Sequence, residues 1–309
     1  MGIAQFFSPP GAFINRYAWS TSSGMEVALM GDKARITGTF TFITPYTYYL
    51  QFMFLAGLAL FSLQENGKKS ILLGAGVGLV LINIVMSGSR APLLISIACA
   101  VPFLSGVMRR TLAGRGRIFK LIIPIMAGSV LLFVFANSFS MLEKRNKEAG
   151  DFNERVSGAF LTPIYMLEHA SFDGTGIGST FMGVQELSQG QKEALAGFSD
   201  VTDDRIGIET GTPGYLFVLF FKLLFIFKTW SLYRRVTERR LKTWALVSLC
   251  YQVSLLWAIP VYQSVAAAFY FTSLGMYFML RKEAGLKRVQ RAPMPSRFGY
   301  PVPGRGIRV

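Results

Sequence analysis

Seven long apolar runs constrain the fold of this chain more than any other feature of its sequence. A helix that crosses a bilayer needs roughly 20 consecutive, mostly apolar residues. None of the runs has a polar stripe at the 3.6-residue period of a helix, which a surface helix would show. The sequence therefore predicts an all-α fold, a polytopic transmembrane helix bundle. The predicted spans are 41–63, 70–86, 91–107, 118–138, 213–230, 243–260 and 263–280.

The charge balance is basic, with 32 Lys and Arg against 17 Asp and Glu and a net charge of +15. Such a balance is also typical of nucleic-acid-binding proteins. Here the basic residues gather after alternate apolar runs and in the tail, where they act as topology signals. We therefore expect no nucleic-acid partner. The basic clusters lie at 68–69, 109–117, 234–242 and 281–308.

The positive-inside rule places these four clusters on the cytoplasmic side of the membrane. Residues 1–40, the turn at 87–90 and the loop at 139–212 then lie on the outer side. The loop holds twelve of the 17 acidic residues. It is predicted to be one large extracytoplasmic loop, periplasmic or extracellular, with short amphipathic helices.

The chain accordingly divides into five segments. Residues 1–40 form an extracytoplasmic N-terminal segment, and residues 41–138 hold the first four spans. The large loop covers 139–212, the last three spans lie in 213–280, and 281–309 form a basic cytoplasmic tail that is expected to be disordered. Because residues 1–40 resemble an interior loop, we expect the chain to be the back portion of a longer bundle. The alternative is insertion with the N-terminus outside.

No motif of a soluble enzyme is present. The chain has one histidine, His169, and its two cysteines, Cys99 and Cys250, lie inside predicted spans, so no metal and no other cofactor is expected. The run Gly174-Thr-Gly-Ile-Gly178 is similar to half of a phosphate-binding loop, but it does not follow a predicted strand. A flexible turn is the favoured interpretation.

Two arginines on the predicted outer side are the sharpest candidates for chemistry. Arg90 lies in the short turn between two spans, where positive charge is costly unless an anion uses it. The alternative is an anchor that reaches the lipid headgroups. Arg35 occupies a similar place just before the first span, and function and anchoring are equally favoured there.

Four further residues of the outer side are weaker candidates. Arg155 begins an amphipathic stretch that lies on the membrane or covers the bundle, and His169 has the only side chain whose usual pKa is near neutrality. Arg205 and Glu209 precede the fifth span, either as an i, i+4 pair or at the mouth of the bundle.

Lys222 is the one ionisable residue well inside a predicted span. An intramembrane charge suggests function. Lys228 is only six residues away, about 9 Å along a helix. We therefore expect the Lys222 ammonium to extend toward the basic side.

These residues form a pattern that resembles the bacterial O-antigen ligase and polysaccharide polymerase superfamily. The pattern comprises Arg-x-x-Gly-Thr-Phe from Arg35, Ser-Gly-Ser-Arg ending at Arg90, the large outer loop, and Asp-Arg followed by Glu-x-Gly-x-x-Gly from Glu209. It covers roughly residues 30–230. The seven spans and the position of His169 depart from the family, whose members have more spans and a histidine closer to the following span.

The resemblance implies a metal-independent glycosyltransferase, a polymerase that joins polyprenyl-diphosphate-linked oligosaccharides. By the same resemblance, Arg90, Arg35, Arg205 and Arg155 bind the diphosphate, and His169 or Glu209 acts as general base. Membrane lipids and polysaccharide-assembly proteins are further expected partners. The alternatives are a ligase that uses another acceptor, a transporter of lipid-linked glycans, and a non-catalytic scaffold or truncated remnant.

Overall fold

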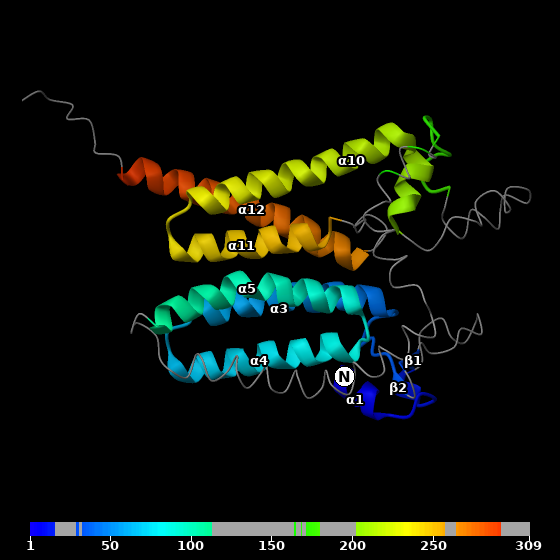
Figure 1. The fold of residues 1–309 in the computed structure, drawn as a ribbon, viewed down its shortest axis with the longest axis horizontal. Coiled ribbons are helices and arrows are strands. Elements are labelled where there is room, and N and C mark those ends of the chain that lie inside the picture. The colour runs from blue at the N-terminus through cyan, green and yellow to red at the C-terminus, as the bar shows by residue number, and fades with distance from the viewer. Residues whose placement is uncertain are drawn as a thin grey trace, which may run out of the picture.

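The computed structural model describes residues 1–15, 29–30, 33–112, 164, 168, 171–179, 202–256 and 264–291. This part of the chain is mostly helical, and its long helices run alongside one another (Figure 1). The long helices are α3 (Ile43–Leu63), α4 (Gly67–Met86), α5 (Arg90–Leu112), α10 (Thr202–Arg235), α11 (Arg239–Ser254) and α12 (Ser264–Arg291). The short elements are α1 (Gly2–Phe7), the 3-10 helix η1 (Phe13–Asn15) and the antiparallel strands β1 (Leu29–Met30) and β2 (Lys33–Ala34).

Three helices of the described ranges are long and apolar enough to cross a membrane. They are Ile43–Leu63, Gly67–Met86 and Arg205–Arg235, and α5 adds the shorter apolar helix Ala91–Gly106. The helical character predicted for these runs is confirmed. The predicted span 118–138 lies outside the described residues.

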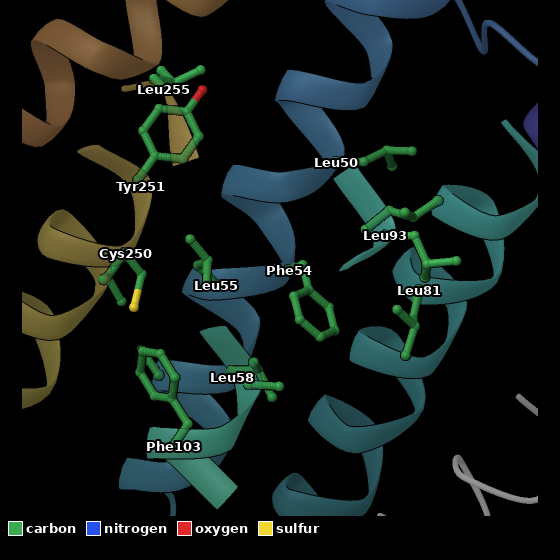
Figure 2. Packing of buried hydrophobic residues seen from close by; sticks show 14 of the residues in the cluster. Leu50, Phe54, Leu55, Leu58, Leu81, Leu93, Phe103, Cys250, Tyr251 and Leu255 are labelled. Atoms are coloured by element: carbon green, nitrogen blue, oxygen red, sulfur yellow. The ribbon is translucent and has the colours of Figure 1, made fainter. Parts of the chain in front are cut away.

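α3 is the central helix and packs against α4, α5, α11 and α12. Leu55 of α3 faces Cys250 of α11, whereas Phe54 faces the side on which α4 lies (Figure 2). We call α3, α4 and α5 the first group of helices and α10, α11 and α12 the second group. Aromatic rings join the two groups, since Phe52 of α3 stacks on Phe269 of α12 with 4.5 Å between ring centroids. The helices α3–α5 and the helices α10–α12 therefore share one apolar core.

A chain of buried polar side chains runs through the second group of helices. The Thr229 hydroxyl of α10 donates to Gln252 Oε1 of α11 (3.1 Å), and Gln252 Nε2 donates to Ser248 Oγ (3.0 Å). The Ser248 hydroxyl in turn donates to the Ser273 carbonyl of α12 (2.7 Å). Such bonds stabilise helix contacts where no water can replace them.

The helices alternate in direction, so the molecule has two distinct ends (Figure 1). We call the end where α3, α5, α10 and α12 finish and where α4 and α11 begin the basic end, because the described members of all four basic clusters lie there. We call the other end of the molecule the opposite end; it carries α1, the strands β1 and β2 and the first turns of α10 (Figure 1).

α12 continues to Arg291, beyond the expected boundary at 280. The expectation of a disordered tail therefore does not hold over 281–291. Leu280 is buried with Val236, Leu241 and Ala245, and Ala284 packs against the same cluster. This apolar contact with the start of α11 extends the helix past the apolar run.

Candidate functional site

The N-terminal segment closes over the opposite end of α3 and α4. The Gln5 amide of α1 is 4% exposed, and its oxygen accepts from the backbone N–H groups of Thr37 (3.2 Å) and Gly38 (2.7 Å). Gln5 Nε2 donates to the Ile14 carbonyl (2.8 Å). One buried side chain thus fixes the backbone on the C-terminal side of Arg35. No pattern in the sequence had marked Gln5.

α1 also packs tightly on the bundle. A Cβ atom at Gly2 would overlap the side-chain ends of Asn83 of α4 and Tyr46 of α3, which would have to shift to admit it. The Tyr46 hydroxyl donates to Asn83 Oδ1 (2.9 Å) and joins α3 to α4 directly beneath α1. Residues 33–40 are therefore held between a helix and the bundle.

Arg35 uses its guanidinium to clamp the connection between α4 and α5. Its Nε donates to the Ser87 carbonyl (2.9 Å), and one of its terminal nitrogens donates to Ser89 Oγ (3.0 Å). Ser87 follows the last residue of α4, so the cation lies at a helix C-terminus, where the helix dipole favours positive charge. Ala34 and Ile36 on either side of Arg35 are fully buried.

The clamped connection is a tight turn that starts α5 at Arg90. Gly88 has φ of 67°, a conformation that favours glycine, and its N–H donates to the Val85 carbonyl (3.0 Å). The Ser87 hydroxyl donates to the Ile84 carbonyl (2.6 Å). The backbone of Arg90 is therefore placed at the N-terminal, electropositive end of α5, beside the Arg35 guanidinium. The side chain of Arg90 lies outside the described part.

A second constellation surrounds a break in α10. Gly211 has φ of 69° and ψ of −177°, which interrupts the helix, and Pro213 has no N–H to donate to the Glu209 carbonyl. Thr212 N–H donates to the Ser171 carbonyl (3.1 Å) rather than to Ile208. The break thus leaves the carbonyls of Ile208 and Glu209 without their helical partners.

The glycine loop at 171–179 satisfies these carbonyls. Thr175 N–H donates to the Ile208 carbonyl (2.8 Å), and Gly176 N–H donates to the Glu209 carbonyl (3.0 Å). Gly174, Gly176 and Gly178 all have positive φ, between 68° and 97°. The run forms a turn, as expected, and this turn is hydrogen-bonded to α10. The N–H groups of Thr175, Gly176 and Gly178 are all used within the protein, unlike those of a phosphate-binding loop.

Glu209 lies inside this second constellation. Its carboxylate is 2% exposed and accepts a hydrogen bond from Gly178 N–H (2.9 Å). Arg205 lies one turn earlier and is half-buried, beside the buried Ile206. The Glu209 carboxylate thus contacts the glycine loop, at the end of the molecule opposite the basic end.

The expectation for Lys222 is wrong. Lys222 is 5% exposed, and its ammonium donates to the Leu256 carbonyl (3.0 Å), just past the C-terminus of α11 and far from Arg239 at its N-terminus. A helix C-terminus leaves carbonyls unsatisfied and attracts a cation. This partner offsets the cost of burial, so the side chain has no need to extend toward Lys228.

The described contacts place Arg35 beside the start of α5, and they place Glu209 beside the glycine loop. His169 and Arg155 lie outside the described residues, as does most of the loop predicted at 139–212. Among the described residues, no group of three or more His, Cys, Asp or Glu could hold a metal ion. Cys99 and Cys250 are free thiols within α5 and α11.

The residues around the Arg35 clamp and those around the break in α10 form two constellations at the end of the molecule opposite the basic end. They consist of cations, hydroxyls and one buried carboxylate. Such groups can bind an anion and move a proton. In comparisons with protein-family models, curated proteins and solved structures, none matches this chain.

Proposed function

We propose that the protein is a membrane glycosyltransferase that joins polyprenyl-diphosphate-linked oligosaccharides into a surface polysaccharide. The opposite end faces the outside of a bacterial plasma membrane, and the basic end faces the cytoplasm. All seven apolar runs cross the bilayer, and 139–212 form the outer loop. This topology follows the positive-inside rule.

One observation carries the proposal, namely the clamp of Arg35 on the turn that begins α5 at Arg90. A guanidinium and the N-terminus of a long helix meet there, beside the position of a second arginine. All three favour anions, and a diphosphate is doubly suited because arginine binds phosphate oxygens in pairs.

The reaction needs such a site. An acceptor hydroxyl attacks the anomeric carbon of the donor, the bond from that carbon to the diphosphate oxygen breaks, and the diphosphate leaves with the bonding electrons. Stabilising the leaving charge is the largest task, and it falls to Arg90 and Arg35, with Arg205 and Arg155 as further ligands. The proton of the hydroxyl passes to His169 or Glu209.

The test uses full-length protein in lipid nanodiscs with a polyprenyl-diphosphate oligosaccharide, and products are separated on a gel. Arg90→Ala should reduce polymer formation by about 100-fold, because a donor to the developing charge is lost. Arg90→Lys should restore little, since a point charge does not reproduce the planar fork. Arg240→Lys, which changes an exposed arginine at the basic end, is the control.

A ladder of normal length and yield in Arg90→Ala would overturn the assigned role. Products extended on a non-glycan acceptor alone would favour a ligase. A transporter is the second candidate, favoured by the buried Lys222 beside the end of α11. Movement of the lipid-linked glycan across the bilayer without formation of new glycosidic bonds would identify it.

A further inference from the structure

A cavity of about 300 Å³ opens at the basic end, between the two groups of helices. Its walls come from the ends of α3 and α10, the second half of α5 and the beginning of α11, which lie toward the same end of the molecule in Figure 1. It is distinct from both constellations of the opposite end. Its polar lining includes Ser62, Tyr233, Thr237, Arg239, Lys242 and Thr243.

The lining is cationic. Arg239 and Lys242 both contribute to it, and no acidic residue does among the described lining residues. Glu65 forms an ion pair with Arg239 (3.1 Å), but its side chain is 83% exposed and lies outside the cavity wall. Lys242 Nζ lies 5.0 Å from the centre of the Tyr233 ring, which holds the ammonium beside the cavity.

Arg239 retains unused binding capacity. Its two terminal nitrogens donate to Glu65 Oε1 and to the Ser62 carbonyl. Its Nε is buried and has no hydrogen-bond partner in the described part of the chain. A buried donor without an acceptor is costly, so the protein does not fully satisfy this guanidinium.

The start of α11 adds a second source of positive potential. α11 begins at Arg239, which lines the cavity, and the first turn of the helix contains no acidic residue. The first N–H groups of a helix lack intrahelical partners, and the helix dipole attracts phosphate to them. Two cations and a helix N-terminus therefore bring positive potential to the cavity wall, and the exposed Glu65 carboxylate pairs with one of them.

The rest of the lining includes the apolar residues Pro102 and Phe103 of α5 and Leu246 of α11. A free phosphate ion would gain nothing from these apolar residues, whereas the glycerol and first methylene groups of a lipid would pack against them. We propose that the cavity binds the phosphate headgroup of an anionic phospholipid from the leaflet at the basic end. Basic pockets between membrane helices on the cytoplasmic side are suited to such lipids.

Binding would have a structural consequence. The cavity touches α3 and α5 of the first group and α10 and α11 of the second. A lipid phosphate shared by Arg239 and Lys242, with its glycerol against Phe103, would hold the groups together at this end. This role does not depend on glycosyl transfer.

The test measures binding of phosphatidylglycerol to the full-length protein by native mass spectrometry, with phosphatidylcholine for comparison. Lys242→Gln should weaken phosphatidylglycerol binding about tenfold, or ~1.4 kcal/mol. Arg240→Gln is the matched control, because Arg240 is exposed, lies two residues away and does not line the cavity. Its binding should stay within about twofold of wild type, since exposed charges contribute little.

Three outcomes would overturn the proposal. Equal loss in Lys242→Gln and Arg240→Gln would indicate general attraction to a basic surface. Equal binding of phosphatidylcholine and phosphatidylglycerol would remove the role of the anionic lipid. Displacement of the lipid by inorganic phosphate at equal concentration would identify a site for free phosphate. Since binding alone is measured, failure here is separate from failure of the polymerase assay.

Discussion

At the scale of single residues, a few side chains determine how the opposite end is built. Arg35 joins two segments that are 52 to 54 residues apart in sequence, and Gln5 joins two that are 32 to 33 apart. Both do so with several hydrogen bonds from one planar group. Planar amides and guanidinium groups lose less freedom per bond formed than a lysine does.

Glu209 gives the prediction that belongs to this scale. Glu209→Gln retains one oxygen that can accept from Gly178 N–H, removes the charge and replaces the other oxygen with an NH2 group. If the carboxylate takes the acceptor proton, polymer formation should fall by about 100-fold in the nanodisc assay. Asp173→Asn, an exposed change in the same loop, should leave the rate unaltered. Full activity of Glu209→Gln would assign the proton to His169 or another loop residue.

At the scale of elements, the break in α10 determines the position of the glycine loop. Pro213 removes one donor, Gly211 takes the left-handed conformation, and the loop supplies the missing N–H groups. The sequence pattern Glu-x-Gly-x-x-Gly thus describes a helix interruption with a docked partner. The resemblance to the superfamily rests partly on this pattern. In this structure the residues of the pattern interrupt α10, and backbone hydrogen bonds hold the glycine loop at the interruption.

Gly211→Ala tests that description. A Cβ atom there would overlap the Phe172 carbonyl, and the backbone conformation is unfavourable for alanine, at a cost of about 2 kcal/mol. The thermal unfolding temperature in detergent should fall, and proteolysis in the loop at 171–179 should increase. Gly76→Ala is the control, because nothing lies within 4 Å of an added Cβ atom in α4. An unchanged melting temperature and cleavage pattern for Gly211→Ala would contradict the docked loop.

At the scale of the whole molecule, two groups of helices share one core and have chemically different ends. One end gathers the basic clusters and the cavity, and the other gathers the Arg35 clamp and the glycine loop. In a bilayer, the polar, cationic end would therefore lie on one side of the membrane and the proposed reaction site on the other.

Cysteine labelling tests this arrangement in cells. In a Cys99→Ala, Cys250→Ala background, Thr39→Cys and Lys68→Cys place exposed thiols at the opposite end and the basic end. A membrane-impermeant maleimide should label Thr39→Cys in cells whose plasma membrane is intact and label Lys68→Cys only after lysis. The reverse pattern would invert the topology, and equal labelling of both would contradict membrane crossing by α3.

Local signals in the sequence determined the helical fold, because length and continuous apolar character depend only on neighbouring residues. They also marked Arg35, Arg90 and Glu209, since charges next to apolar runs are unusual. His169 and Arg155, outside the described residues, remain predictions. Only the tertiary structure decided what these charges contact. Lys222 lies beside the end of α11, and Gln252 joins the buried polar chain, because partners many residues away offset the cost of burial. Composition and spacing set which residues are unusual, whereas long-range hydrogen bonds and packing set which of them meet.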